Sequence, residues 1–432
     1  MSIDSSTRAP SKPSMVARPE LELGLRANWK QFSLLVVVNA FVGAMVGMER
    51  SILPAIAEQE FRLVAHTAIL AFIVVFGVSK AFTNYFAGRF SDTCGRKIVL
   101  VIGWLIATPV PFLLMWAPSW NWILLANVFL GVSQGLTWST TVIMKIDLAG
   151  PNNRGTALGI NEFAGYFAAG AAALATGWIA SEVGLRPQPF YLGVAFVLIG
   201  LLLSVMVVRE TRDYARLEAA RTPSQGAAAM PSQSSIFWQT SVRDPNLSSL
   251  SQAGLVNNLN DGMAWGLFPV VFAGAGMTLA QIGTLAAIYP TVWGLCQLFT
   301  GALSDRIGRK GLIVAGMCVQ ALGIAIIAIA SQFSWYAVGA VLLGLGTAMV
   351  YPTLLAAIGD AVSPAWRAST VGVYRFWRDL GYAVGAMLSG LVADQYGVAS
   401  AVWLVAGITF LSGMFVAVRM RSGTQARKRS RK

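Results

Sequence analysis

The sequence contains few charged side chains and even fewer residues suited to metal or disulfide chemistry. Only 12% of its 432 residues are charged, about half the share that is usual in soluble domains. It has a single histidine, His66, and three cysteines, Cys94, Cys296 and Cys318, whose number is odd and whose spacing is not that of ligand pairs. These scarcities argue against a soluble domain, a disulfide framework and a zinc site.

Motifs for nucleotide and covalent chemistry are also missing. No GxxxxGK[ST] phosphate loop occurs, so we expect no ATP hydrolysis. One histidine and scattered carboxylates cannot supply a nucleophile–base pair, so we predict no enzyme activity and no cofactor. Residues 1–30 are polar, contain Pro10, Pro13 and Pro19, and lack an apolar h-region. We interpret them as a disordered cytoplasmic arm rather than a signal peptide.

Long apolar runs dominate the rest of the chain, which is 56% hydrophobic. A hydrocarbon core needs roughly 20 mainly apolar residues per helix. With that window we predict twelve helices, near 31–53, 65–88, 98–117, 121–146, 156–180, 190–208, 251–273, 280–301, 311–330, 335–360, 369–394 and 400–418. The runs are continuous rather than alternating, which excludes a transmembrane β-barrel.

A charged ten-residue stretch, Gly88–Lys97, recurs 213 residues later as Gly301–Lys310. Further pairs keep this offset: Gly131 with Gly344, Asp147 with Asp360, Pro151 with Pro364, Arg154 with Arg367, and Gly159 with Gly372. Such self-similarity indicates a duplicated half. The predicted organisation is an arm (1–30), a six-helix bundle (31–208), a cytoplasmic linker (209–250), a second six-helix bundle (251–418) and a basic tail (419–432).

Basic residues predict the orientation. On this topology, 25 of the 32 Lys and Arg residues lie in loops on the side of the N-terminus, and only Arg62 and Arg186 lie in the opposite loops. The positive-inside rule then places both termini in the cytoplasm, in a plasma membrane that we expect to be a bacterial inner membrane. The basic tail fits attraction to anionic lipid better than binding of nucleic acid.

The two hairpins carry the pattern G-x-x-x-D-[RT]-x-G-[RK]-[RK], and with the six-plus-six arrangement the chain resembles the Major Facilitator Superfamily of transporters. The resemblance implies two pseudo-symmetric all-α bundles, in which helices 1, 4, 7 and 10 line a central cavity that opens alternately to each side. The hairpins are like those of drug/proton antiporters. However, Thr93 and Asn127 stand where such relatives often carry Arg, and helix 5 lacks their Gly-Pro motif.

Both hairpins are predicted to act as gates. Asp92 and Asp305 can meet the positive N-terminal end of a helix from the other half. Arg96 and Arg309 can pair with Asp147 and Asp360 at the inner ends of helices 4 and 10. The alternative is that the basic residues only determine topology. The full gating set is Gly88, Asp92, Gly95, Arg96, Lys97, Asp147, Gly301, Asp305, Arg306, Gly308, Arg309, Lys310 and Asp360.

Nine charged residues of the predicted helices are expected to lie at membrane depth, away from the helix ends. The basic ones are Arg50, Lys80, Lys145, Arg375 and Arg378, and the acidic ones are Glu49, Glu162, Asp261 and Asp379. Each costs roughly 2.5–3.5 kcal/mol at a helix centre, so they must pair or line water. An unpaired carboxyl group in apolar surroundings favours its protonated form. The four acidic residues are therefore our candidates for proton coupling.

Polar stripes on several helices suggest a binding face. The substrate-binding candidates are Asn39, Arg50, Gln134, Trp138, Lys145, Asn257, Asp261, Trp265, Tyr374, Arg375, Arg378 and Tyr382. Snorkelling is an alternative for Lys145, and interhelical hydrogen bonding is one for Asn257 and Asp261.

Helix 11 carries the densest cluster of these residues. Arg375 and Asp379 are spaced i, i+4 and can neutralise each other, which leaves Arg378 to bind a planar carboxylate. The alternative is a structural network that locks helix 11 to helix 5 through Glu162.

The sequence therefore predicts a secondary transporter of a small polar or anionic organic solute. We expect it to be proton-coupled, to export its substrate and to function as a monomer without nucleic acid. The alternatives are proton-coupled uptake of an organic anion and a membrane sensor that keeps the fold without transport.

Overall fold

The computed structural model describes residues 21–150, 154–221, 232–362 and 366–421, and within these ranges every regular element is helical. The N-terminal half contains α1 (Trp29–Arg50), α2 (Leu53–Gln59), α3 (His66–Ile69), α4 (Ala71–Cys94), α5 (Arg96–Ala107), α6 (Pro109–Met115), α7 (Trp120–Ala149), α8 (Arg154–Val183), the 3-10 turn η2 (Gln188–Phe190) and α9 (Tyr191–Met206). The C-terminal half contains α12 (Pro245–Gly274), α13 (Leu279–Ile307), α14 (Arg309–Ile329), α15 (Phe333–Ala361), α16 (Arg367–Tyr396) and α17 (Val398–Arg419).

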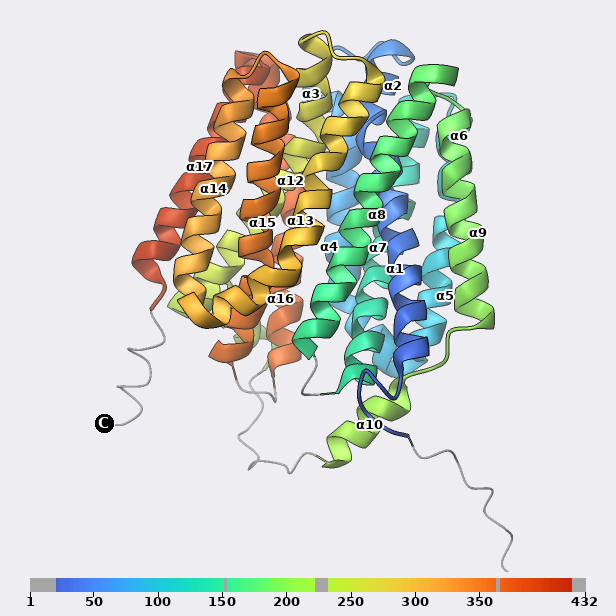
Figure 1. Ribbon diagram of the computed structural model, residues 1–432, viewed down its shortest axis with the longest axis vertical. Helices are drawn as coiled ribbons and strands as arrows, with labels where there is room; N and C mark the ends of the chain where they lie inside the picture. The colour runs from blue at the N-terminus through green and yellow to red at the C-terminus, as the bar shows by residue number, and fades with distance from the viewer. Residues whose placement is uncertain (1–20, 151–153, 222–231, 363–365, 422–432) are drawn as a thin grey trace, which may run out of the picture.

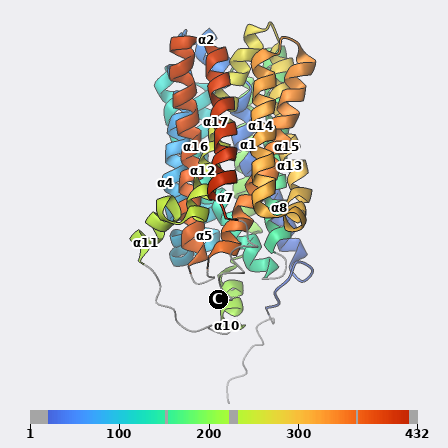
Figure 2. The ribbon, with the colours of Figure 1, turned by 90° about the vertical axis from the view of Figure 1, so that its left-hand side faces the viewer.

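The long helices run side by side across the molecule, with the two halves next to each other (Figure 1). We call the end at which α1 begins and α17 ends the termini face; α10 (Arg212–Arg221) lies beneath it in both views (Figure 2). Each of the twelve predicted segments is occupied by helix, interrupted at residues 51–52, 70 and 108, so the all-α membrane architecture is confirmed.

The duplication is visible in the backbone. Helices α8 and α16 are both 30 residues long and keep the 213-residue offset at both ends. Gly95 and Gly308 end equivalent helices with φ of 103° and 90°, and Gly184 and Gly397 with φ of 98° and 86°. These left-handed conformations favour glycine because a Cβ atom would be strained there. The turn chemistry was therefore duplicated together with the helices.

Eight of the described helical segments are long and apolar enough to cross a membrane by composition alone. The spans in α4, α7, α12 and α16 do not meet that criterion. Each of these helices carries buried polar or charged side chains, such as Lys80, Lys145, Asp261 and Asp379. These four helices supply interior polar groups, and so do α1 with Arg50 and α8 with Glu162, although both of those helices meet the criterion.

The structure adds detail to three of the predicted segments. Part of the arm is ordered, because Gly24 N donates to Leu148 O at 2.9 Å. The linker contains α10, α11 (Gln233–Trp238) and a π-helical turn (Gln239–Arg243). The second bundle begins at Pro245 rather than 251, because the Asp244 carboxylate caps the backbone N–H groups of Asn246 and Leu247. Residues 1–20 of the arm and residues 422–432 of the basic tail lie outside the described residues.

The two halves meet along two helix pairs, α4 with α16 and α8 with α13. Small residues allow the close approach: a Cβ atom on Gly77 would lie 2.7 Å from Ala383 N, and one on Gly177 would lie 2.7 Å from Gly283 Cα. Within the first half, a Cβ atom on Gly43 would lie only 2.0 Å from Gly165 O. Glycine at these contacts lets the helix backbones touch.

We expect Gly43→Ala to lower the melting temperature of the purified protein, because α1 and α8 would have to separate. Gly407→Ala is the matched control, since nothing lies within 4 Å of its Cβ position. In α17 the added methyl should raise helix stability by about 0.5–1 kcal/mol. Thermal unfolding followed by tryptophan fluorescence measures both variants. Equal melting temperatures would contradict the close packing.

Candidate functional site

Each hairpin forms the ion pair expected within its own half. Arg96 Nε donates to Asp147 Oδ2 at 3.2 Å, and Arg309 Nε donates to Asp360 Oδ2 at 3.0 Å. The first pair is buried, whereas Asp360 is largely exposed. The side chains of Asp92, Asp305 and Arg306 lie outside the described set. A gating role for both hairpins stays a prediction.

The start of the linker binds the first hairpin, which the sequence did not suggest. Glu210 accepts the backbone N–H groups of Arg96 and Lys97, each at 3.1 Å, and thereby caps the N-terminus of α5. Thr211 donates to Asp147 at 2.8 Å, and Arg212 donates to Thr93 O at 2.9 Å. Residues 210–212 therefore belong to the hairpin structurally.

The two halves are joined at mid-depth by a bidentate ion pair. Arg50 on α1 donates to both carboxylate oxygens of Asp261 on α12, at 3.0 and 3.2 Å. Both side chains are buried, and the Arg50 guanidinium also lies over the Trp265 ring at 5.1 Å. The geometry satisfies most of the polar atoms of two charges that would be costly to bury alone.

Arg378 on α16 makes a second connection between the halves. It donates to Tyr166 on α8 at 2.9 Å, pairs with its neighbour Asp379 at 3.1 Å, and lies 4.1 Å from the centroid of Tyr351 on α15. The eleventh predicted helix, α16, is thus connected to the fifth, α8, through Tyr166. The alternative through Glu162 is not what the structure forms.

The predicted Arg375–Asp379 pair is wrong. Asp379 binds Arg378 and accepts from Asn84 on α4, while Arg375 donates to Ser139 on α7 at 3.3 Å. Both residues therefore face the first half and form hydrogen bonds with partners there, instead of pairing with each other along α16. Tyr374 is buried against Gly254 instead, with its hydroxyl unpartnered.

Lys80 on α4 is the central residue that the sequence analysis did not select as a ligand. It is 6% exposed, and its ammonium lies 5.4, 5.4 and 5.2 Å from the ring centroids of Phe76, Trp138 and Tyr382. Two of these rings come from the first half and Tyr382 from the second. A lone lysine in an apolar run gives no periodic signal, and only the fold shows its surroundings.

The first half holds a polar network of its own. Trp138 Nε1 and Asn161 Nδ2 donate to Glu162 at 3.1 and 3.0 Å, and Lys145 binds the Asn161 side chain. Lys145 is fully buried, so it does not snorkel. Asn39 joins α1 to this network through Asn161 O at 2.7 Å. Gln134 donates to Val42 O at 2.7 Å and holds α7 against α1.

The second half has a corresponding network, and it accounts for part of the polar stripe on α12. Gln320 on α14 donates to Asn257 at 3.0 Å and accepts from Asn260 at 2.7 Å. Thr409 on α17 donates to Asn260 at 2.6 Å. Asn257 thus makes an interhelical hydrogen bond within its bundle, whereas Asp261 and Trp265 turn to the interface between the halves.

Glu49 has a different environment from the other interior carboxylates. It is fully buried beside Asn127, and neither of its carboxyl oxygens has a hydrogen-bond partner. Asn127 Nδ2 donates to Ile123 O at 3.1 Å, while its Oδ1 atom is also unpartnered. The Asn127 side chain is thus the polar group next to this carboxyl group, which forms no ion pair among the described residues.

The halves are also tied at the face opposite the termini. Asp394, in the last turn of α16, accepts from the backbone N–H groups of His66 and Thr67 and from the Thr67 hydroxyl. The ring of His66 also lies 3.0 Å from this carboxylate. Between this contact and the Arg50–Asp261 pair, Phe72 and Phe76 pack against Trp265. The central groups are closed toward this face.

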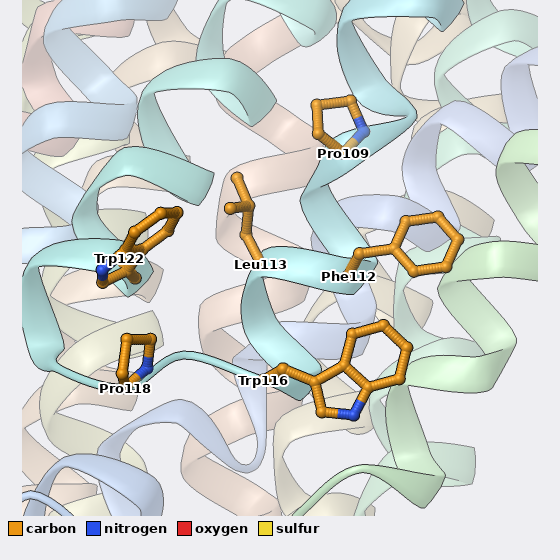
Figure 3. Close-up of a pocket in the computed structure, with 6 residues that line it drawn as sticks. All are labelled: Pro109, Phe112, Leu113, Trp116, Pro118 and Trp122. Carbon is orange, nitrogen blue, oxygen red and sulfur yellow. The ribbon is translucent and has the colours of Figure 1, made fainter.

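A pocket of 340 Å³ lies elsewhere, between α6 and the beginning of α7 (Figure 3). Its lining is apolar and aromatic: Pro109, Phe112, Leu113, Trp116, Pro118 and Trp122. Tryptophan is typical of the membrane–water boundary. With no charged side chain in its lining, this pocket is not the site of the interior ionic chemistry.

Within the part of the chain that the structure describes, no group of three or more His, Cys, Asp or Glu residues is arranged to hold a metal ion. The chemistry available at mid-depth is reversible: hydrogen bonding, ion pairing, aromatic stacking and protonation. These groups can bind and release a solute or a proton without covalent change.

Comparison with known proteins agrees with this architecture. The family model of the Major Facilitator Superfamily matches residues 35–252 and 250–432. The multidrug resistance protein MdtG of Citrobacter koseri is 23% identical over 416 residues, which cover 93% of this chain and 98% of that protein. The probable 4-methylmuconolactone transporter of Cupriavidus pinatubonensis is 24% identical over 350 residues, 78% of each chain.

Solved structures show the same fold at low identity. The nucleoside transporter NupG has a TM-score of 0.70 at 16% identity, covering 90% of this chain and 100% of that one. The human organic anion transporter MFSD10 has a TM-score of 0.65 at 17% identity, covering 90% and 99%. With the duplicated helical halves, the paired hairpins and a family match along nearly the whole chain, this protein belongs to the Major Facilitator Superfamily of membrane transporters.

Proposed function

We propose that the protein exports a small polar or anionic organic solute by alternating access, in exchange for protons. The observation that carries this proposal is the meeting of buried ionic groups from both halves at mid-depth: Arg50 with Asp261, and Arg378 with Asp379 and Tyr166. Such groups are costly to bury in a membrane protein, and those that occur there usually serve the protein's function. A site shared by two halves is also one that their relative movement can open.

The excess of basic groups supports an anionic substrate. Five basic residues and four acidic residues lie in the interior set, and Asp261 and Asp379 are already engaged by Arg50 and Arg378. A planar carboxylate suits a guanidinium that already lies against aromatic rings. The name of the MFSD10 structure, an organic anion transporter, is consistent with this substrate class.

Export is supported by names among the relatives. MdtG proteins from several bacteria are named for multidrug resistance, and another relative is named as a bacillibactin exporter. The bias of basic residues toward the termini face supports a cytoplasmic location for that face. The contacts at Asp394 and at Arg50–Asp261 would then lie toward the outer side.

Glu49 is the proposed proton carrier. Neither of its oxygens makes a well-formed hydrogen bond, and the side chain that acts on this carboxyl group is that of Asn127. A proton on Glu49 can supply the missing hydrogen bond, whereas a bare carboxylate there would be buried without compensation. Glu49 also directly precedes Arg50 in α1. Its protonation can therefore affect the segment that carries the ion pair between the halves.

Transport is tested by flux in proteoliposomes. Organic acids that raise the melting temperature of the purified protein are first identified, and the radiolabelled acid is then loaded into vesicles with an internal pH dye. A proton gradient should drive solute movement against its own gradient, with protons moving in the opposite direction. Solute and protons moving together would establish the uptake symporter instead, and ligand binding with neither flux would establish a sensor.

Glu49→Gln should uncouple the two fluxes, because the amide mimics the protonated acid and cannot release a proton. We expect solute exchange down its own gradient to persist within about twofold of the unmodified protein, while acceleration by a pH gradient is lost. Glu182→Gln, at an exposed position at the end of α8, is the matched control. Unaltered pH-driven flux in Glu49→Gln would remove Glu49 from the coupling proposal.

The Arg50–Asp261 pair should behave as a unit. Arg50→Met or Asp261→Asn alone leaves one buried charge without its partner, a loss of about 3–5 kcal/mol. The double variant should recover much of that stability but not transport. A double-mutant cycle on melting temperatures, with flux measured on the same samples, checks this expectation. Additive losses in the double variant would show that the two side chains act independently.

A further inference from the structure

The ammonium of Lys80 is held by aromatic rings rather than by a carboxylate. Its three ring contacts, with Phe76, Trp138 and Tyr382, are all between 5.2 and 5.4 Å. Among the described residues, the carboxylates that act on it are Asp379, Asp261 and Glu162, and none of them forms an ion pair with it. Each of these carboxylates already accepts hydrogen bonds from other groups.

Aromatic contacts compensate only part of the free-energy cost of burying this charge. A cation–π contact contributes about 2 kcal/mol when it is desolvated, whereas the effective penalty for burying one ion is several kcal/mol. The three rings hold the ammonium in place and still leave its positive charge without an opposite one. An anion brought to Lys80 would complete the site without displacing an existing ion pair.

Several buried hydrogen-bond donors of the interior have no partner. In the described part of the chain they include Arg50 Nε, Trp265 Nε1, Trp293 Nε1 and Arg378 Nε. Unpartnered acceptors also occur, among them Glu162 Oε2, Gln134 Oε1 and both carboxyl oxygens of Glu49. A carboxylate ligand is made only of acceptors and can receive hydrogen bonds from such donors.

The surroundings are aromatic over a continuous stretch that crosses both halves. Trp138 lies 5.2 Å from Tyr166, which is stacked 3.4 Å from Trp293 on α13. On the other side of Lys80, Phe76 contacts both Trp265 at 5.1 Å and Tyr382 at 5.6 Å. Rings of this kind pack by offset stacking or edge-to-face contact against another planar group.

The internal repeat shows that the fold does not require a lysine at this position. With the 213-residue offset, the counterpart of Lys80 on α4 is Trp293 on α13. Trp293 is fully buried and stacks on Tyr166, so the equivalent place in the second half is filled by an apolar ring. The ammonium is a departure from the repeat, located where the two halves meet.

We propose that Lys80 is the primary anchor for the substrate's carboxylate, with Arg378 as the second cation, and that the substrate is an aromatic or otherwise planar conjugated carboxylate. This assignment rests on the proposed function and narrows it. On binding, the carboxylate pairs with the Lys80 ammonium, and the planar body of the substrate packs among the rings of Trp138, Tyr166 and Tyr382. No covalent change occurs.

Three small probes of similar size separate charge from aromaticity: benzoate, benzamide and cyclohexanecarboxylate. Benzamide keeps the ring and removes the charge, while cyclohexanecarboxylate keeps the charge and removes the π system. Binding is measured on the purified full-length protein by isothermal titration and by the emission of the site tryptophans. We expect benzoate to bind at least tenfold more tightly than either of the other probes.

Lys80→Met should weaken benzoate binding by at least tenfold, and Lys80→Arg should restore part of it, because a guanidinium keeps the charge. Lys30→Met, an exposed residue at the start of α1, is the charge-matched control and should bind as the unmodified protein does. The melting temperature without ligand is recorded for each variant. Restoration by Lys80→Arg distinguishes loss of the anchor from loss of the fold.

Three results would overturn the inference in different ways. If both carboxylates bind equally well and Lys80→Met leaves their affinity unchanged, Lys80 and the aromatic class are rejected while an anion transporter remains. If benzamide binds and neither carboxylate does, the anionic substrate of the proposed function is rejected as well. Failure of all three probes to bind would also reject the aromatic carboxylate class.

Discussion

A single ion pair between Arg50 and Asp261 determines how the interior of this protein is organised. It joins α1 to α12 across the two halves, with both carboxylate oxygens engaged and both side chains buried. Two charges in this setting are tolerated only together, because each loses its hydration and only the attraction of the other compensates for that loss. Any state in which the halves separate at this level must provide water or a ligand for both groups.

The remaining polar groups divide according to this constraint. Side chains that bond within one half, such as Asn39 with Asn161 or Asn260 with Gln320, hold helices of one bundle together. Side chains that bond across the halves, such as Arg378 with Tyr166, gather at mid-depth. In the proposed alternating access, the first group would keep each bundle rigid, and the second would have to change partners as the halves move.

The sequence was sufficient for the large-scale architecture because its signals repeat. Twelve apolar runs, two hairpins and one offset give the bundles, and the Arg96–Asp147 and Arg309–Asp360 contacts are formed as the spacing suggested. Side-chain partners between helices were harder to foresee. Spacing along α16 favoured Arg375 with Asp379, but rotation of that helix toward α4 and α7 gives each of them a partner in the other half.

Lys80 and Glu210 are two further residues whose partners could not be predicted from the sequence. Neither lies in a motif or a stripe, and each acquires its surroundings only when distant segments come together. Asn257 lies on a polar stripe that suggested a binding face, but its Oδ1 atom accepts from Gln320 inside its own bundle. Pattern identifies which residues are buried and polar, while tertiary packing decides what they face.

The contact at Asp394 has a consequence for how the opposite face opens. One carboxylate collects the N–H groups of two successive residues and a hydroxyl at the start of α3. Because these donors share one acceptor on a rigid helix end, a small displacement of α16 weakens all of them together. Separation of the halves at this face must therefore break several hydrogen bonds to one carboxylate, and all of them depend on the position of a single helix end.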